Sequence, residues 1–409
     1  MTGDGTAAGD ERNRRLWTVA IFLSVATTGA MLQARGAVLP SLAGDFGPPE
    51  WQLGLVAPAG TVGYLVVMVV VGSGAGHLDS RRFILVGLVG SALALLAMGL
   101  APAFALFLGA IVIRGAATGA VRALDRPLLS HFYPGERGRV YNRYDMAWAV
   151  GAASGPLAVA GAVAVGSWRL VYGALAVTVA LVAALFWRLD PPALRTTERP
   201  LTRDGLAPLL GRPEVLGMLV VLFFTTGVEG ALFTWLPYYA SAQLPDGLSE
   251  ATLTLLLVTY VPGRYVSGWL AERVDYLTLA GALVAGLVPA VAYTFVLADG
   301  LWVLVGVAAT GLLLSGAFPT LLAYATEAVP EHSGPVNAIA TGVGSVGIGS
   351  VPAVLGVVVD RWDVASAMSL LVVPLVAGLA VLAVAGLAQR RRDRQHAGVT
   401  PSHEYERDD

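Results

Sequence analysis

The sequence predicts an all-α integral membrane protein with twelve transmembrane helices in two pseudo-symmetric bundles of six. The 409-residue chain is 56% hydrophobic and only 13% charged, whereas an average soluble domain has about 25% charged residues. Its mean hydropathy is +0.69. Its apolar runs are long enough to cross a bilayer, which takes about 20 helical residues. They recur as six runs, one longer polar connection and six more runs.

The predicted spans follow one another with mostly short connections. The first apolar run is about 25 residues long, too long for the core of a cleaved signal peptide, so we expect it to remain as the first span. The predicted spans are residues 16–40, 51–75, 83–101, 103–124, 145–166, 169–188, 215–240, 250–270, 277–297, 301–325, 336–358 and 364–388.

The connection between the sixth and seventh spans is rich in proline and arginine, and it divides the chain in two. The expected organisation is a cytoplasmic N-terminus at 1–15, a six-helix bundle at 16–188, a cytoplasmic loop at 189–214, a second six-helix bundle at 215–388 and a cytoplasmic tail at 389–409.

Arginine is unevenly distributed among the predicted loops, and cytoplasmic loops carry the excess of positive charge in membrane proteins. With a cytoplasmic N-terminus, Arg169 and Arg361 are the only loop arginines on the outside. The sequence therefore predicts a multi-pass protein of the cell membrane, plasma or inner, with both termini in the cytoplasm.

Several classes of function are disfavoured by composition. The chain has no cysteine, so it has no disulfide, thiolate metal site or cysteine nucleophile. A net charge of −2 gives no bulk basicity for nucleic acid, and no histidine pair has the His-x-x-x-His spacing of a metal site. We expect no enzyme activity, no cofactor and no nucleic-acid partner, and we expect a monomer in the lipid bilayer.

One carboxylate, Glu229, lies near the middle of the seventh predicted span, about 16 Å from Ala240 by helical rise. A carboxylate at that depth costs about 2.5–3.5 kcal/mol on insertion scales. Such a carboxylate is retained where it is paired, where it is protonated or where it faces a water-filled cavity. Glu229 is therefore either a functional group that faces a transport pathway or a structural carboxylate bonded to a neighbouring helix.

Two similar motifs follow the second span of each half. The second half has Gly268-Trp-Leu-Ala-Glu272-Arg273, and the first half has Gly76-His-Leu-Asp79-Ser-Arg81-Arg82. With the six-plus-six organisation, these motifs resemble the major facilitator superfamily of transporters over about residues 16–390. The second motif matches well, whereas the first is one residue short before its acid and lacks the glycine between the charges.

The resemblance implies alternating access, in which these motifs make contacts at a cytoplasmic gate. The implied gate residues are Asp79, Arg81, Arg82, Glu272 and Arg273. The alternative is that each motif is a charged turn that only fixes the topology.

Arg114 lies in the fourth span, about 16 Å from Ala103 by helical rise. The resemblance implies that spans one, four, seven and ten line a central cavity, so Arg114 and Glu229 would face one another. A state-dependent pair would keep Glu229 ionised, and its separation would favour the protonated acid. Substrate or gating could then be coupled to a proton. Alternatively, Arg114 stabilises the first bundle only.

A charged group near the cytoplasmic end of the fourth span comprises Arg122, Asp125 and Arg126, which neighbour one another at helical spacing. Asp145, at the start of the fifth span, is their expected partner. We interpret this group as a structural charge cluster at the inner gate.

Arg264 lies in the eighth span, about 9 Å from its cytoplasmic end. That depth differs from the depth of Glu229 and argues against a salt bridge between them. We therefore expect Arg264 to belong to the gate.

Arg35 lies in the first span, about 8 Å from its outer end. It either extends outward to the interface, pairs within the protein or meets an anionic solute. On the seventh span, Trp235, Tyr238 and Tyr239 share one face at helical spacing. That face either stacks on a sugar or drug-like cation, or anchors the helix at the interface.

Further motifs suggest two kinds of transport. The run Gly151-Ala-Ala-Ser-Gly155-Pro156 resembles the antiporter motif of the superfamily, although small residues also allow close helix packing. The stretches at 227–239, 262–264 and 316–319 resemble fucose-permease-like sugar transporters. The resulting hypothesis is a proton-coupled secondary transporter of a small polar solute such as a sugar, and a drug/proton antiporter is the alternative.

Overall fold

The computed structural model describes residues 4–74, 79–133, 136–190, 211–245, 248–329 and 333–397, and in these ranges the regular structure is helical. The twelve long helices of these ranges are α1 (Asp4–Ala37), α4 (Val56–Gly74), α5 (Ser80–Leu100), α6 (Phe104–Phe132), α7 (Arg137–Ala164), α8 (Arg169–Arg188), α10 (Pro213–Gln243), α11 (Ser249–Ala271), α12 (Tyr276–Ala292), α13 (Trp302–Ala328), α14 (Ser333–Arg361) and α16 (Val372–Ala397). Four short elements accompany them: α2 (Leu39–Phe46), α3 (Glu50–Leu53), the π-helical turn η2 (Tyr293–Leu297) and α15 (Val364–Ser369).

Each predicted span coincides with one of the long helices, with its short neighbour where there is one. Eleven helices in the described ranges are long and apolar enough to cross a membrane. The twelfth, α11, carries Arg264 within its length. The main differences are extensions. Helix α1 begins at Asp4, so residues expected to form a polar N-terminal segment continue the first helix. Most of the central 189–214 loop lies outside the described residues.

The helices form two bundles with the same internal packing. In one bundle α1 packs on α7, α4 on α6 and α5 on α8. In the other, α10 packs on α14, α11 on α13 and α12 on α16. In each half, therefore, the first helix contacts the fifth, the second the fourth and the third the sixth. This repeated pairing is the pseudo-symmetry that the two sequence motifs predicted.

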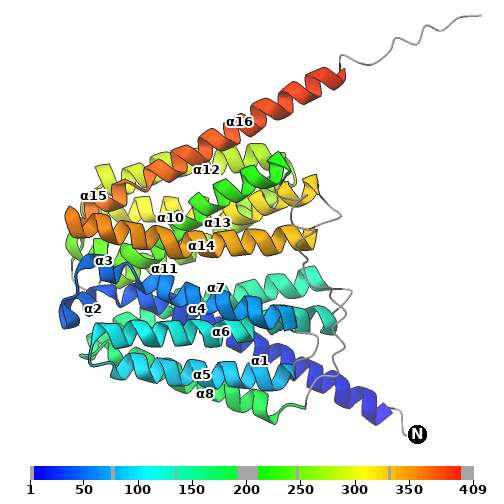
Figure 1. Cartoon of the computed structure of the whole chain (residues 1–409), viewed down its shortest axis with the longest axis vertical. Helices are drawn as coiled ribbons and strands as arrows, with labels where there is room; N and C mark the ends of the chain where they lie inside the picture. The colour runs from blue at the N-terminus through cyan, green and yellow to red at the C-terminus, as the bar shows by residue number, and fades with distance from the viewer. Residues whose placement is uncertain are drawn as a thin grey trace, which may run out of the picture.

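Figure 1 shows the two bundles one above the other, with α1–α8 below and α10–α16 above. Helix α1 begins and α16 ends at the same end of the molecule, which we call the terminal end. The short helices α2, α3 and α15 lie at the opposite end, which we call the far end. Large apolar side chains such as Val86, Leu181 and Val384 are exposed, as expected for a surface that faces lipid.

Small residues bring the paired helices together. Gly151 of α7 lies against the Ala26 carbonyl of α1, and Gly155 lies against Ala30. In the second half, Gly347 of α14 lies against Phe223 of α10. Side chains at these glycines would collide with a neighbouring backbone. The structure therefore shows the packing role that the glycine-rich fifth span suggested, and the eleventh span packs in the same way.

The two bundles contact each other toward the far end. Gly36 of α1 lies against the Phe233 carbonyl of α10. A Cβ at Gly54 would stand 3.0 Å from the Cα atom of Gly356 on α14. Thr254 donates a 3.4 Å hydrogen bond to the Ala153 carbonyl across the bundles. The molecule is therefore closed at its far end.

Candidate functional site

The mid-span carboxylate Glu229 is partly buried on α10. Its Oε1 accepts a 2.9 Å hydrogen bond from the hydroxyl of Tyr260 on α11. Tyr260 is only 3% exposed. The neighbour of Glu229, Gly230, packs against Ile348 of α14, which holds α10 in the middle of its bundle. Tyr260 was not expected from the sequence. The feature that could have identified it is a tyrosine in an apolar run, one helical turn before Arg264.

Arg264 lies next to this pair. Its guanidinium is 5.9 Å from the centre of the Tyr260 ring, and its charge interacts electrostatically with Glu229. No salt bridge forms between the two, as the depth argument predicted, but Tyr260 connects them. Arg264 is exposed. The three side chains form a series from the partly buried carboxylate of Glu229 to the exposed cation of Arg264.

On the other bundle, Arg35 of α1 and Arg114 of α6 lie side by side. Arg35 is 2% exposed and Arg114 3% exposed. A Cβ at Gly60 of α4 would stand 3.1 Å from the Nη1 atom of Arg35 and 3.1 Å from the Nη2 atom of Arg114. Arg35 donates a 3.4 Å hydrogen bond to the Ala57 carbonyl. Arg35 therefore does not extend outward to the interface, because its side chain turns into the bundle.

Several buried polar atoms of the first bundle have no hydrogen-bond partner. They are the Nε atom of Arg114 and the Thr118 hydroxyl on α6, the Tyr172 hydroxyl on α8, and both amide atoms of Gln33 on α1. Tyr172 of α8 is close enough to interact electrostatically with both guanidiniums. Among the described residues, no carboxylate forms a salt bridge with Arg35 or Arg114. The expected Arg114–Glu229 pair is not formed in this conformation, because Glu229 is bonded to Tyr260.

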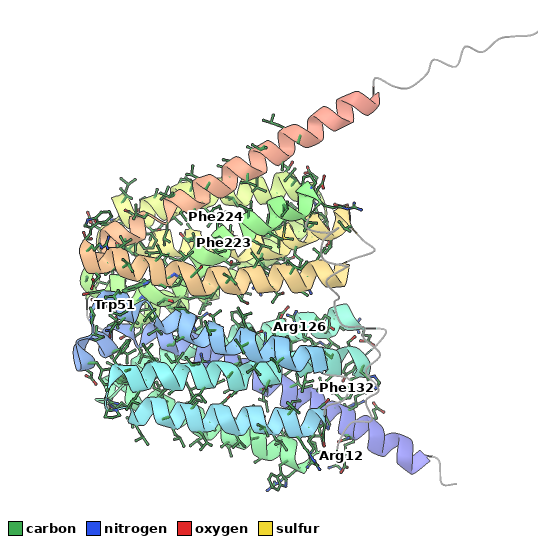
Figure 2. All side chains as sticks on the ribbon, viewed as in Figure 1. Arg12, Trp51, Arg126, Phe132, Phe223 and Phe224 are labelled. Carbon is green, nitrogen blue, oxygen red and sulfur yellow. The ribbon has the colours of Figure 1, made fainter. Side chains whose placement is uncertain are left out.

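The predicted charge cluster is assembled between α6 and α7. Asp125 accepts a hydrogen bond from the hydroxyl of Tyr144, which in turn accepts one from Arg122. Arg122 lies 3.5 Å from Asp125. Arg126 pairs with Asp145 at 3.0 Å. Figure 2 shows Arg126 toward the end that carries Arg12, opposite Trp51.

The charged residues of the two repeated motifs make local contacts. Asp79 caps α5 by accepting from the Arg82 amide and pairs with its side chain at 3.1 Å. Arg81 donates to the Trp187 carbonyl of α8. Arg273 donates to the Trp269 carbonyl at 2.7 Å and lies 3.8 Å from Glu272. Each contact stays within one bundle. Gly76 of the first motif lies outside the described residues.

The three aromatic residues Trp235, Tyr238 and Tyr239 of α10 contact different parts of the molecule. Trp235 is fully buried and donates to the Pro352 carbonyl of α14 at 3.0 Å. Tyr239 donates to the Thr294 carbonyl of η2 at 3.4 Å. Tyr238 faces the Glu50 carboxylate of the other bundle. In this conformation Trp235 and Tyr239 connect helices and do not present a shared stacking face.

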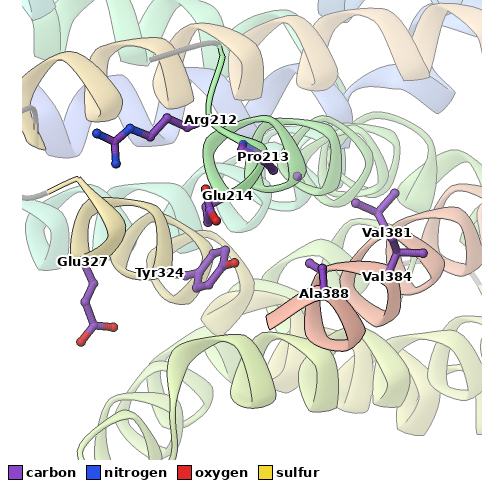
Figure 3. Close-up of a pocket in the computed structure, with 10 residues that line it drawn as sticks. Arg212, Pro213, Glu214, Tyr324, Glu327, Val381, Val384 and Ala388 are labelled. Atoms are coloured by element: carbon purple, nitrogen blue, oxygen red, sulfur yellow. The ribbon is translucent and has the colours of Figure 1, made fainter. Parts of the chain in front are cut away.

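A separate cavity of about 770 Å³ lies at the terminal end of the second bundle, between α10, α13 and α16. Figure 3 shows Arg212, Glu214, Tyr324 and Glu327 at its polar side and Val381, Val384 and Ala388 at its apolar side. Its lining residues do not include Glu229, Arg35 or Arg114. Among the described residues, no cluster of three His, Cys, Asp or Glu side chains could hold a metal ion.

Comparisons with known proteins agree with this architecture. Residues 21–352 match the sequence profile of the Major Facilitator Superfamily. No curated protein sequence matches as a relative.

Among solved structures, the chain is similar to a bacterial homologue of the human lysosomal transporter Spinster in its inward-facing, occupied conformation. The TM-score is 0.73 at 18% identity, over 91% of this chain and 96% of that chain. The unoccupied inward-facing form gives a TM-score of 0.72 at 16% identity, over 91% and 95%. The E. coli fucose:proton symporter gives 0.61 at 18% identity, over 91% and 98%. At these identities the likeness concerns the fold.

Proposed function

Because the chain belongs to the major facilitator superfamily, a family of multi-pass membrane transporters, we propose that it is a proton-coupled secondary transporter of a small polar solute. The bundles would alternate between two states around a site at their interface. Glu229 would carry the proton, and Arg114 would be its partner on the other bundle. The uneven arginine distribution supports placing the terminal end in the cytoplasm. The described conformation would then have its bundle-to-bundle contacts on the side away from the cytoplasm.

The observation that carries the proposal is an incomplete charge arrangement across the interface. Glu229 is held by a neutral hydroxyl on its own bundle. Arg114 on the other bundle has no carboxylate partner among the described residues. An ionisable group within a membrane is retained where it has a function or a partner. A carboxylate that changes partner between states provides a coupling step.

In the proposed cycle, Glu229 pairs with Arg114 in one state and with Tyr260 in the other. Protonation removes the charge that attracts Glu229 to Arg114, which favours the Tyr260-bonded arrangement. The contact between Gly36 and Phe233 lies one helical turn from Glu229, so movement of the bundles there would change the distance between these groups. Proton transfer would thereby accompany the change of access.

The gate residues support the same cycle. Among the described residues, the salt bridges of Asp79, Arg82, Glu272 and Arg273 are local. We propose that some of them bond across the bundles when the terminal end closes. Arg122, Asp125, Arg126 and Asp145 would stiffen the same end of the first bundle.

A drug/proton antiporter is the second candidate, favoured by the Gly151–Pro156 motif. Here Gly151 and Gly155 lie against α1, a packing role that does not depend on transport direction. Two buried guanidiniums would also repel a cationic drug. The glycine packing leaves the transport direction open, and the guanidiniums favour a polar or anionic solute over a cationic drug.

The test is proton-driven transport in proteoliposomes, using a solute selected by thermal shift from sugars, anions and cationic drugs. Glu229→Gln should abolish accumulation driven by a pH gradient and leave counterflow exchange intact. Glu136→Gln, an exposed acid paired with Arg139, is the matched control and should accumulate solute normally. Accumulation by Glu229→Gln equal to that of the wild type would exclude Glu229 as the coupling group.

A further inference from the structure

The first bundle contains an unneutralised pair of positive charges. The side chains of Arg35 and Arg114 are almost fully buried. One terminal nitrogen of each lies 3.1 Å from the same point above Gly60, so these nitrogens are within about 6 Å of each other, a distance at which like charges repel. The repulsion has no evident structural purpose in a bundle already held together by apolar packing.

Elsewhere the same bundle neutralises a buried arginine with an acid. Arg122 lies 3.5 Å from Asp125 and bonds Tyr144. Arg35, by contrast, has one weak bond to a carbonyl, and the Nε atom of Arg114 is buried without an acceptor. A buried charge without a partner is strongly unfavourable. The missing component is therefore an acceptor with negative charge.

The donors around this position suit an oxyanion. Guanidinium groups recognise carboxylate and phosphate through paired N–H donors. The Tyr172 hydroxyl, which has no partner, lies near both guanidiniums and adds a further donor. Gly60 lets both guanidiniums approach the α4 backbone closely, since a Cβ there would stand 3.1 Å from a terminal nitrogen of each.

The position is next to the interface between the bundles. Gly36 follows Arg35 and contacts Phe233 of α10. Thr61 follows Gly60, and a Cβ at Gly349 of α14 would stand 3.1 Å from it. A group bound by the arginines would therefore sense the relative movement of the two bundles. It would also compete with Glu229 for Arg114.

We propose that Arg35 and Arg114, converging above Gly60 with the Tyr172 hydroxyl beside them, bind a carboxylate or phosphate group of the transported solute. This inference rests on the proposed transport function and specifies its substrate class as an anion. An anion and a proton would then move together: protonated Glu229 remains on Tyr260 and leaves both arginines to the solute. Because Glu229 is the one proton carrier in this scheme, each cycle transfers one proton with one solute anion.

The test is equilibrium binding to the purified full-length protein in detergent at constant ionic strength. The probes are inorganic phosphate, succinate and gluconate, with glucose as the neutral control and tetraphenylphosphonium as the cation. We expect at least one anion to bind saturably and raise the melting temperature, and glucose and the cation to do neither. Arg35→Gln and Arg114→Gln should weaken that binding at least tenfold. Arg361→Gln, an exposed arginine at the end of α14, is the matched control and should bind as the wild type does.

Two further measurements separate binding from folding. Without ligand, Arg35→Gln and Arg114→Gln should melt at the wild-type temperature or higher, because each removes a repelling charge. A purely structural role predicts lower melting temperatures. Lysine at both positions keeps the charges but loses the paired donors, so it should bind the anion more weakly than arginine.

The proposal is overturned if no anion binds saturably to the wild type, or if the glutamine and lysine variants bind as tightly as it does. Arginine-dependent anion binding without proton-driven accumulation would leave the oxyanion site standing and contradict proton coupling. Proton-driven accumulation of glucose or the cation, with no anion binding, would support the transporter and contradict the oxyanion site.

Discussion

Tyr260 of α11 donates a 2.9 Å hydrogen bond to Glu229 of α10. The bond joins two helices of one bundle. Its acceptor, Glu229, is the carboxylate whose position within a membrane span is energetically costly. It leaves Arg114, on the other bundle, without that carboxylate. The chemistry of the site therefore depends on which partner Glu229 has in each state.

Replacing Tyr260 by phenylalanine should impair coupling more than exchange. The hydroxyl is the donor that holds the protonated Glu229, and a hydrogen bond between uncharged groups contributes about 0.5–1.5 kcal/mol. We therefore expect proton-driven accumulation to fall by roughly twofold to tenfold, while counterflow exchange continues. Tyr265→Phe, a change of an exposed tyrosine on the same helix, is the matched control. Normal accumulation by Tyr260→Phe would show that the bond is not required for coupling.

Exchanging charges between the bundles tests the state-dependent pair. Arg114→Glu and Glu229→Arg should each abolish transport, because each places like charges at the interface. The double variant restores an opposite pair and should recover part of the activity, measured as counterflow in proteoliposomes. If the double variant is as inactive as either single variant, the cross-bundle pair is contradicted.

The far-end contact can be trapped by a disulfide, since the chain has no cysteine of its own. A Cβ at Gly349 would lie 3.1 Å from the Cβ of Thr61, close to the separation of about 3.5–4.5 Å found in disulfides. The double variant Thr61→Cys with Gly349→Cys should form a cross-link under oxidising conditions and lose transport. Reduction should restore it. Transport unaffected by a fully formed cross-link would mean that the bundles need not separate there.

The charge cluster between α6 and α7 should contribute strongly to stability. Asp125 is 4% exposed, and Asp125→Ala leaves the Arg122 guanidinium without its acid. Breaking such a buried pair costs about 3–5 kcal/mol. The Arg126–Asp145 pair has side chains 41% and 46% exposed, so Asp145→Ala should cost about 1 kcal/mol or less. Thermal unfolding in detergent gives the comparison, and equal losses would contradict the assigned burial.

The N-cap of α12 should give a pH-dependent contribution. Backbone and side-chain hydrogen bonds from Thr278 lower the pKa of Asp275 below its ordinary 3.8. Because the folded-state pKa is the lower one, the stabilisation is fully present above pH 3.8 and is lost as the pH falls through the lowered value. Asp275→Asn retains a capping oxygen and should lose less stability between pH 5 and pH 3. Melting temperatures that change equally with pH in both proteins would contradict this.

Much of the architecture followed from the order of residues. Apolar runs of the length of a bilayer predicted all twelve long helices, because the backbone can cross lipid in this protein only as a helix. Helical spacing placed Arg122, Asp125 and Arg126 together, since residues three and four apart share a face. Glu229 was identified by depth alone, which depends on local rise and not on neighbours.

The contact partners of these residues could not be predicted from the sequence. They lie on separate helices, and only packing fixes the rotation of each helix about its axis. The sequence placed Arg35 near an interface and Arg264 away from Glu229. The packed bundle turns Arg35 inward beside Arg114, and it brings Tyr260 between Glu229 and Arg264. Helical spacing places Trp235 and Tyr239 on one face with Tyr238. In the structure, Trp235 donates to the Pro352 carbonyl and Tyr239 donates to the Thr294 carbonyl.

The sequence by itself determined the membrane class, the twelve helices, their division into halves and the position of one buried acid, because each of these depends on local composition and length. Only the tertiary structure decided that Glu229 bonds Tyr260, that Arg35 and Arg114 converge above Gly60, and that the far end is closed. Those relationships arise from close contacts between helices that are distant in the chain. At Gly60, for example, the absence of a side chain allows Arg35 and Arg114 to approach the same point.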